Sequence, residues 1–266
     1  MQRKHFLQLL TGLSLPGVLP SQAAGPAPRV PDSVAQLIVG IAPDWNSPRA
    51  QLMAFSRVSP AAPWQPAWAQ ACPVMLGKAG LAWGNGALPV PHGQPGVPSK
   101  REKDQRAPAG LFRIGTLYGY QPDSLPGLRL PTHRVTARDC WIDDVTSPDY
   151  NRHVIVDPAN PPPWYAKQRM RLGDFAYEFL LEVGHNTDPV LPGQGSAIFF
   201  HIRRGPATPS HGCTTMARPD LVKLLRWLDA RANPHYVLLP RQAYQNLRQA
   251  WNLPAPFQSP RPPPAP

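Results

Sequence analysis

The chain of 266 residues is 42% hydrophobic and 16% charged, so it is long enough to bury a sizeable core and too apolar to be disordered throughout. Its 38 prolines exceed ordinary usage and belong largely in loops and tails. The formal net charge of +11 indicates an anionic binding partner. The basic residues form no run of five, which argues against nucleic acid as that partner and favours an anionic surface of the cell envelope.

The N-terminus has the pattern of a secretory signal peptide. Basic residues at 3–4 precede an apolar stretch over 6–19, and the small residues Ala23 and Ala24 offer a cleavage site. The apolar stretch is too short to anchor the protein in a bilayer. We therefore expect residues 1–24 to be removed on export, by the general secretory or the twin-arginine route. The mature protein is then expected in the periplasm or cell envelope, as a monomer without a stable membrane anchor.

Residues 36–253 form one predicted domain, between a flexible leader over 25–35 and a disordered proline-rich tail over 254–266. Short apolar runs bounded by Gly, Pro, Asn or Asp recur along the domain. They occupy residues 36–42, 51–58, 71–77, 110–120, 152–157, 177–184, 196–202 and 235–240. So many short strands predict a mostly β fold, a single β-sandwich or barrel-like domain with a few peripheral helices.

Two helices are predicted near the C-terminus. Residues 218–231 place four leucines at helical spacing on one face, and Pro219 suits the first turn of such a helix. Residues 241–251 are the second candidate. Because the first helix follows Cys213 closely, this cysteine is expected on a turn between the helix and the strand that carries His201.

The three cysteines differ in their surroundings. Cys72 and Cys140 lie in segments without other reactive groups, whereas Cys213 is framed by serine, histidine and glycine. An exported protein with three cysteines leaves at least one of them unpaired. The economical hypothesis is a disulfide between Cys72 and Cys140 with Cys213 free, although spacing alone does not fix the connectivity.

The stretch HIRRGPATPSHGCTTM over 201–216 allows four interpretations. His201, His211 and Cys213 could supply three zinc ligands, but no second cysteine lies nearby and no CxxC or HExxH motif is present. A redox thiol would need a resolving cysteine, which is also lacking locally. A structural turn is the plain alternative, and nucleophilic catalysis is the fourth.

Nucleophilic catalysis fits this stretch best. A neighbouring imidazole can lower the pKa of a thiol and accept its proton, and His201 at the end of an apolar strand would be held rigidly. Gly212 would let the backbone turn tightly enough to expose Cys213. The amides of these two residues could then form an oxyanion hole. We therefore favour Cys213 as a nucleophile, without a metal or cofactor.

These residues carry a resemblance to a family. A strand-borne histidine followed by SHGC at 210–213 resembles the catalytic signature of the YkuD-type L,D-transpeptidases, bacterial cell-wall enzymes with a cysteine nucleophile. The segment APAGLFRIG at 107–115 is similar to the TPxGxF stretch of that family. Further segments that resemble the exported YkuD/ErfK-like branch follow in matching order, so that the resemblance covers roughly residues 36–240.

The resemblance implies a role for each matching residue. Cys213 would attack the carbonyl between the L-centre and the D-centre of a peptidoglycan stem peptide and release the terminal D-residue. His201 would act first as general base and then as proton donor. Ser210, His211 and Gly212 would shape the turn and assist the oxyanion. An amine of a second stem peptide would then take the acyl group and complete a cross-link.

The chain departs from the family in two respects. Many relatives have glycine directly after the first histidine and a longer gap before SHGC, whereas here Ile202 follows His201 and the loop is short. Relatives commonly carry arginine two places after the cysteine, where this chain has Thr215, so Arg203, Arg204 or Arg218 would have to hold the substrate carboxylate. Two alternatives stay open. One is a hydrolase of the L,D-carboxypeptidase or amidase type, which uses water at the same site, and the other is a non-catalytic wall-binding module.

The remaining polar residues receive plainer interpretations. Asn186, which follows a strand in the same β region, is expected to border the cleft. Four other histidines are interpreted as isolated surface or hydrogen-bonded side chains rather than ligands. These are His92, His133, His153 and His185.

Two further groups leave a structural and a functional interpretation side by side. Asp143 and Asp144 look like a carboxylate pair for acid–base work, but their segment is rich in turn formers and predicts a loop. Trp64, Trp68 and Trp83 either line a glycan groove or pack in the core.

Overall fold

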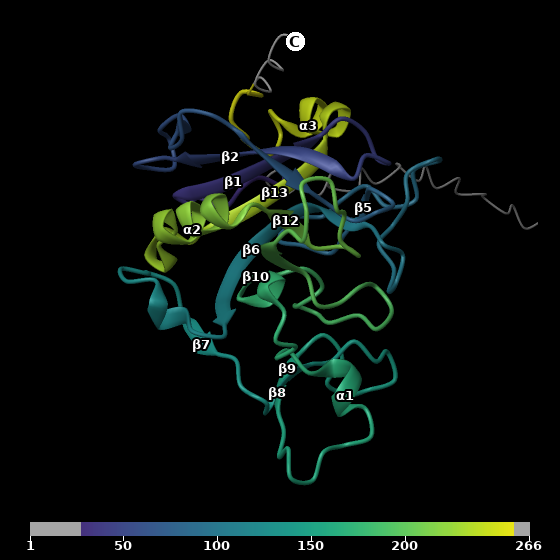
Figure 1. Ribbon diagram of the computed structural model, residues 1–266. Helices are drawn as coiled ribbons and strands as arrows, with labels where there is room; N and C mark the ends of the chain where they lie inside the picture. Colours follow the sequence, from purple (N-terminus) through teal and green to yellow (C-terminus); the bar gives the residue numbers. More distant parts are fainter. Residues whose placement is uncertain (1–27, 258–266) are drawn as a thin grey trace, which may run out of the picture.

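One sheet closes on itself in the computed structural model, which describes residues 28–257 (Figure 1). Its strands are β1 (Gln36–Ala42), β2 (Arg49–Ser56), β4 (Cys72–Met75), β6 (Ala107–Gly119), β10 (Phe179–Val183), β11 (Phe199–Ile202), β12 (Thr214–Met216) and β13 (His235–Pro240). They are hydrogen-bonded in the order β1-β13-β6-β10-β11-β12-β4-β2, and β2 pairs back with β1. Within the described residues these eight strands make a closed barrel, so the predicted mostly β, barrel-like fold is confirmed.

Shorter strands extend this barrel and build a small lobe beside it. The strands β3 (Gln65–Pro66), β5 (Leu81–Trp83) and β7 (Thr132–Arg134) pair with barrel strands. A separate two-stranded sheet of β8 (Asp139–Trp141) and β9 (His153–Ile155) lies with helix α1 (Tyr165–Gln168) at the lower end of Figure 1. Residues 135–174, which contain these elements, are called the β8–β9 lobe below.

Strand β1 is buried along its whole length, as its continuous apolar sequence predicts. It runs parallel to β13 on one side and antiparallel to β2 on the other, and α3 (Arg241–Leu247) packs against β1 and β13. A strand covered on both faces needs apolar side chains at successive positions rather than alternating ones. The sequence QLIVGIA therefore fits the centre of the sheet and no exposed edge.

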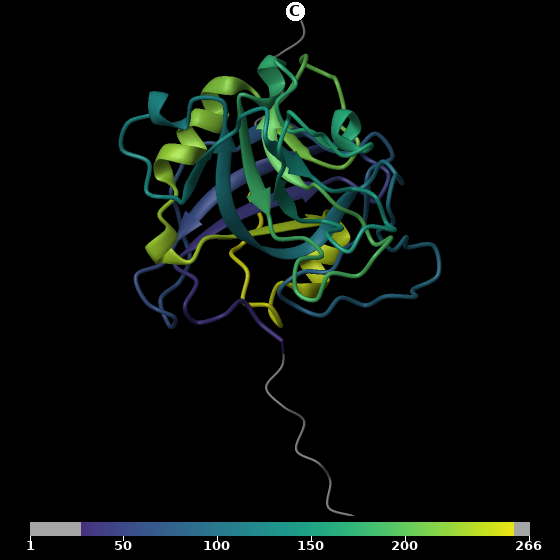
Figure 2. The same ribbon diagram turned by 90° about the horizontal axis from the view of Figure 1, so that it is seen from below.

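Both predicted C-terminal helices are present. Helix α2 (Arg218–Trp227) has Pro219 in its first turn and packs against β11, and its leucines are buried in the barrel core. These are Leu221, Leu224 and Leu225, followed by Leu228 at the end of the helix. Helices α2 and α3 lie outside the sheet, at separate places (Figures 1 and 2). Single turns of 3-10 helix, η1 (Pro122–Ser124), η2 (Phe175–Tyr177) and η3 (Ala230–Ala232), complete the described elements.

Apolar side chains form a large core inside the barrel and a second cluster between the barrel and the β8–β9 lobe. The second cluster includes Tyr118 of β6, Trp141 of β8 and Phe199 of β11, and Cys213 packs against it. The ring centroids of Trp141 and Phe199 lie 4.9 Å apart in an edge-to-face arrangement. The lobe therefore packs directly beside the strand that carries His201.

The ends of the predicted domain differ from expectation. Val30 and Val34 are fully buried, so two residues of the expected flexible leader anchor it in the core, while Asp32 and Ser33 between them are exposed. The chain also stays packed beyond residue 253, because Phe257 contacts Phe55 with ring centroids 6.1 Å apart. The predicted signal peptide and the tail from residue 258 lie outside the described residues. Across 28–257 no helix has the length and the apolar run needed to cross a bilayer.

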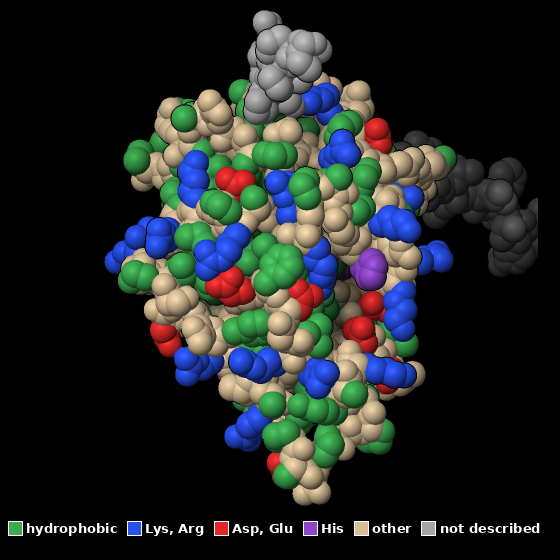
Figure 3. Space-filling model, in the orientation of Figure 1, with side chains coloured by type: hydrophobic (Ala, Val, Ile, Leu, Met, Phe, Trp, Pro, Cys, Tyr) green, Lys and Arg blue, Asp and Glu red, His purple; other side chains and the backbone are tan. Residues whose placement is uncertain are grey.

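The hypothesis of a disulfide between Cys72 and Cys140 is wrong, because the structure has both cysteines as free thiols. Cys72 belongs to the barrel core on β4, whereas Cys140 belongs to a separate apolar cluster in the β8–β9 lobe. Of the three tryptophans considered for a glycan groove, Trp68 and Trp83 are buried in the core, and Trp64 is partly buried against it. Lys and Arg side chains are spread over the face in Figure 3 with Asp and Glu between them, which fits the scattered charge of the sequence.

Candidate active site

Cys213 lies directly before β12, beside the start of β11. Its Sγ approaches the main-chain oxygen of Ala197 at 3.5 Å, and Ser210 Oγ donates to the Cys213 carbonyl at 2.6 Å. The same Ser210 Oγ accepts the Gly212 amide at 3.0 Å, so the serine braces the turn on both sides of the glycine. Gly212 has a φ of +152°, and a Cβ there would come within 3.1 Å of the Arg106 carbonyl oxygen. The turn therefore requires glycine at this position.

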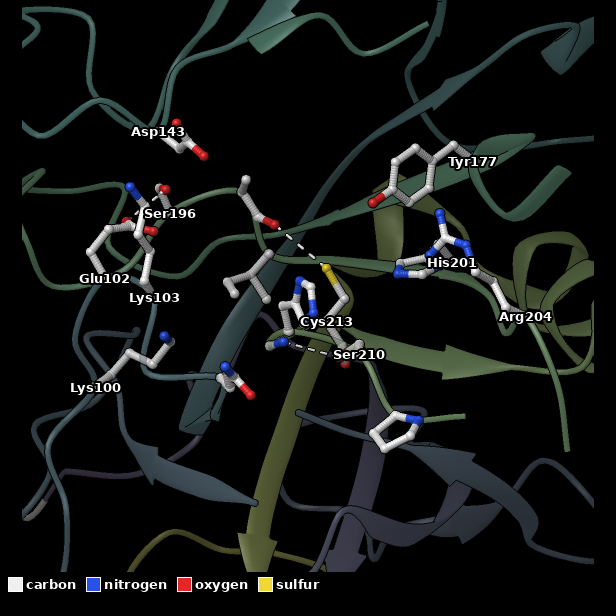
Figure 4. Close-up of a pocket in the computed structure, with 16 residues that line it drawn as sticks. Lys100, Glu102, Lys103, Asp143, Tyr177, Ser196, His201, Arg204, Ser210 and Cys213 are labelled. Atoms are coloured by element: carbon white, nitrogen blue, oxygen red, sulfur yellow. Dashed lines mark hydrogen bonds between the residues drawn. The ribbon is translucent and has the colours of Figure 1, made fainter. Parts of the chain in front are cut away.

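His201 is held rigidly on β11. The strand pairs in parallel with β12 so that His201 lies opposite Thr215, which brings the histidine and Cys213 to the same part of the sheet. The His201 side chain is 4% exposed, and its Nδ1 lies 2.9 Å from the Ile202 carbonyl oxygen, an acceptor that fixes the proton on Nδ1. Nε2 then keeps its lone pair, and Figure 4 shows the ring turned toward the Cys213 sulfur.

Burial keeps both members of this pair neutral at rest. Desolvation raises the pKa of the Cys213 thiol to about 11, against a smaller lowering effect of the Phe199 main chain and of nearby cations. Desolvation also lowers the pKa of His201 to about 4. At neutral pH the pair is thus a thiol beside a neutral imidazole, and the imidazole is in the state that can accept a proton.

A pocket of about 460 Å³ opens over Cys213 (Figure 4). Lys100, Glu102 and Lys103, from the segment before β6, lie across the pocket from Arg204. The remaining lining includes Gln105, Asp143, Tyr177, Ser196, Ala197, Ile198, His201, Pro209, Ser210, His211, Gly212 and Cys213. The wall therefore carries charges of both signs around one thiol.

A second cavity of about 190 Å³ meets the first at the thiol. Both cavities are lined by Tyr177, His201 and Cys213. The second one continues under the β8–β9 lobe, where Trp141 and Met170 form part of its wall. Two separate spaces thus give access to Cys213.

Among the three arginines considered for carboxylate binding, Arg204 is the one that lines the pocket. It is paired with Asp174, and its guanidinium lies 5.1 Å from the centroid of the Tyr177 ring. The Tyr177 ring in turn packs edge-to-face on His201, with centroids 5.2 Å apart. Arg204 and Tyr177 therefore also hold the imidazole in place.

The other two arginines point elsewhere. Arg218, at the start of α2, makes a bidentate ion pair with Glu178 on the exposed surface, with N–O distances of 2.7 and 2.8 Å. Arg203 is not part of either cavity wall around Cys213. Of the predicted substitutes for the missing family arginine, the geometry thus retains Arg204.

Asn186 does not border the cleft as predicted. Its side chain is 1% exposed, and its amide donates to the carbonyls of Leu191 and Gly195 at 2.9 and 3.0 Å. With a φ of +54°, Asn186 closes a tight loop after β10, a backbone conformation that asparagine tolerates better than most residues. Asn186 therefore anchors the loop after β10 and does not contact the pocket around Cys213.

Several pocket residues were not singled out by the sequence analysis. Tyr177, Lys100 and Glu102 line the pocket although neither the motif nor the family resemblance pointed to them. The run KREKDQR before the APAG segment was the available signal, because charge concentrates there in a chain that is otherwise poor in it. Asp143 also lines the pocket, and burial raises the pKa of its carboxyl.

Two histidines interpreted as isolated lie together, which corrects the sequence analysis. The Nε2 atoms of His133 and His153 lie 2.5 and 2.7 Å from the same carboxylate oxygen of Asp139. His185 is fully buried, with Nε2 2.9 Å from the Gln194 carbonyl oxygen, and desolvation lowers its pKa to about 4. His92 remains an exposed side chain, beside Ser99.

The site geometry agrees with a comparison to known families. The model of the YkuD family, the L,D-transpeptidase catalytic domain, matches residues 72–237. A comparison with curated proteins and one with solved structures returned no match. The matched range is more than half of the chain, runs from β4 into β13 and includes His201 and Cys213. The chain therefore belongs to the YkuD family of L,D-transpeptidase catalytic domains, enzymes that act on peptidoglycan peptides.

Proposed function

We propose that this protein is a peptidoglycan L,D-transpeptidase that works through a thioester on Cys213. The observation that carries the proposal is the position of Cys213 and His201, which both line the place where two cavities meet. A nucleophile with a base beside it accounts for acylation, and two approaches to the same sulfur account for a donor and an acceptor.

Acylation begins when His201 Nε2 takes the proton from the Cys213 thiol. The sulfur forms a bond to the carbonyl carbon between the L-centre and the D-centre of a stem peptide, and the carbonyl electrons move to oxygen. The Gly212 amide is occupied by Ser210 Oγ, so we assign stabilisation of this oxyanion to the Cys213 amide. Collapse of the intermediate breaks the C–N bond, and the imidazolium gives its proton to the departing amine of the D-residue.

Transfer reverses these roles. An amine of a second stem peptide attacks the thioester carbonyl, and His201 accepts its proton. The C–S bond breaks, the sulfur leaves as thiolate, and the imidazolium returns the proton to it. Stem peptides carry amines and carboxylates, which are complementary to a pocket wall that contains Arg204 and Lys103 as well as Glu102 and Asp143.

Hydrolysis is the second candidate function, because water can take the place of the acceptor amine. The second cavity favours transfer, since water needs no binding space of that size. A non-catalytic wall-binding module is the third possibility, and the braced Cys213 turn would then have no chemical role.

The test is incubation of the purified protein with tetrapeptide muropeptides, followed by separation and mass analysis of the products. Dimers are expected, together with release of the terminal D-residue. Cys213→Ala is expected to lose more than about 1,000-fold of this activity and His201→Ala about 100-fold or more. Tripeptides without dimers would favour the hydrolase, and unchanged turnover by Cys213→Ala would refute the cysteine mechanism.

We also propose that the protein acts outside the cytoplasm, as a monomer in the periplasm or cell envelope. The support is the signal-peptide pattern over 1–24 together with a substrate class that lies in the wall. Fractionation of cells that express the full chain checks the location. Processed protein is expected in the envelope fraction, and unprocessed protein in the cytoplasm would contradict the proposal.

A further inference from the structure

We propose that His133, Asp139 and His153 form a binding site for a divalent transition-metal ion, of the class represented by Zn²⁺. The bound ion would connect the β8–β9 lobe to the barrel. Within the described residues these side chains form a group whose ligand atoms all lie within 4.8 Å of one another. The site is separate from the Cys213 pocket, since none of its three residues lines either cavity there.

The donor atoms converge from three different strands. His133 is on β7, which pairs with β6 of the barrel, while Asp139 is on β8 and His153 is on β9. Nε2 of His133 lies 2.5 Å from Asp139 Oδ1, and Nε2 of His153 lies 2.7 Å from the same oxygen. Two imidazole nitrogens and one carboxylate oxygen therefore face a single point.

Hydrogen bonds to Oδ2 hold the Asp139 carboxylate so that Oδ1 faces the two histidines. The Thr136 amide and the Thr136 hydroxyl both donate to Asp139 Oδ2 at 2.7 Å. These bonds leave Oδ1 to the histidines and fix the plane of the carboxylate, as hydrogen bonds behind a metal ligand commonly do. The Asp139 side chain is only 3% exposed, so its orientation is also set by packing.

The size of the group suits a tetrahedral ion after a small adjustment. Zinc bonds of about 2.0–2.1 Å place the ligand atoms about 3.3 Å apart. Rotation of the rings would have to withdraw each nitrogen from Oδ1 by less than about 1 Å and bring the two nitrogens, now within 4.8 Å, closer together by up to about 1.5 Å. The His133 side chain is 34% exposed, and this open side gives an ion access and leaves space for water as a fourth ligand.

An ion at this site would stabilise the contact between the β8–β9 lobe and the barrel. Tyr118 of β6 packs against both imidazoles, with ring centroids 5.5 Å from His133 and 5.0 Å from His153. Trp141, two residues after Asp139, packs on Tyr118 and on Phe199 of β11. An ion bound here would fix the lobe that forms one wall of the second cavity.

The experiment titrates untagged, chelator-treated protein with Zn²⁺ by calorimetry and follows its thermal unfolding. It uses the Cys213→Ala background, so that the thiol of Cys213 cannot bind the metal together with His201. We expect one equivalent of Zn²⁺ to bind and to raise the melting temperature. The double substitution His133→Ala/His153→Ala should abolish both effects, and His92→Ala, an exposed histidine elsewhere, should change neither.

Two further measurements keep the test independent of the folding of that double variant. Thr136→Val leaves all three ligands in place and should weaken Zn²⁺ binding about 10- to 100-fold by releasing the carboxylate. Co²⁺ bound to the Cys213→Ala protein should give the visible d–d bands of a four-coordinate nitrogen and oxygen site. Absence of binding would leave a purely hydrogen-bonded cluster, and a thiolate-to-cobalt charge-transfer band would place the metal on a cysteine. Either result overturns the proposal.

Discussion

At Cys213 and His201, burial acts on two titratable groups in opposite directions. It raises the pKa of the thiol to about 11 and lowers the pKa of the imidazole to about 4. Many cysteine nucleophiles instead rest as a thiolate beside an imidazolium, which requires the two pKa values to lie the other way round. In the proposed mechanism, an uncharged pair requires proton transfer to His201 to accompany attack on the substrate.

The pH dependence of alkylation tests this resting state. Below a thiol pKa of about 11, the thiolate fraction rises about tenfold per pH unit, so the rate of Cys213 alkylation by iodoacetamide should climb steadily from pH 5 to pH 10. Mass spectrometry of the peptide that contains Cys213 measures the rate without interference from Cys72 and Cys140. A plateau between pH 5 and pH 8 would instead indicate an ion pair with His201.

The backbone conformation of Gly212 leads to a second prediction about a single residue. Its φ of +152° is unfavourable for other residues, and an added Cβ would lie 3.1 Å from the Arg106 oxygen and 3.3 Å from Ile198 Cδ1. Gly212→Ala should therefore displace Cys213, lower kcat strongly and cost about 1–3 kcal/mol of unfolding free energy. Gly127→Ala is the control, since Gly127 has a φ of +81° and open space around it, and it should leave turnover unchanged. Equal turnover of the two variants would contradict this account.

The sequence predicts helices and strands that have a strong local pattern of apolar residues. It does not predict short strands that are extended only because they pair with neighbouring strands. The strand QLIVGIA has the predicted bounds, and α2 starts at the residue expected from Pro219 and its leucines. The three-residue strand β12 was missed because TTM is too short a run to predict a strand, although threonine favours strands. It is extended by its partners, since Thr215 pairs with His201 on β11 and with Met75 on β4.

The side chain of Gln36 connects β1 to the end of α2 by hydrogen bonds, and this connection should stabilise the fold. This first residue of β1 is 8% exposed, donates from Nε2 to the Trp227 carbonyl at the end of α2, and accepts the Asp229 amide on Oε1, both at 2.8 Å. Gln36→Leu would leave both main-chain groups without this partner and should lower the unfolding free energy by about 1–3 kcal/mol. Urea unfolding measures it, with the exposed Gln70→Leu as control. Similar midpoints for the two variants would show that water replaces the glutamine.

At the scale of the whole molecule, the active site joins segments that are far apart in the sequence. The motif around Cys213 was recognisable because its residues are neighbours in the chain. Lys100, Asp143 and Tyr177 reach the same pocket only because the barrel closes and the β8–β9 lobe packs beside it. Pairing of distant segments has no signature in a single sequence, and the assumed disulfide to Cys140 was wrong for the same reason.

The two ends of the described chain also meet, at one side of the barrel. The Val30 amide donates to the Trp251 carbonyl at 3.0 Å, and the Ala35 amide donates to the Ala232 carbonyl at 2.8 Å. Residues 30–35 are thus part of the packed body. Three of their main-chain carbonyls, those of Pro31, Asp32 and Val34, accept hydrogen bonds from the Arg57 guanidinium.

Arg57 should therefore be a stability determinant remote from the active site. It is 5% exposed, and its guanidinium donates to the carbonyls of Val34 and Pro31, both at 2.7 Å. Arg57→Met keeps the apolar stem but leaves the Val34 carbonyl unpaired and removes one of the two donors of the Pro31 carbonyl, which keeps the Val34 amide. The unfolding free energy should therefore fall by about 1–3 kcal/mol, and proteases should cut residues 28–35 more readily. Arg49→Met, at the exposed first residue of β2, should be close to neutral. The alkylation rate of Cys213 should stay the same in both variants, because neither arginine touches the pocket. If Arg57→Met were as stable as Arg49→Met, residues 30–35 would be held by apolar burial alone.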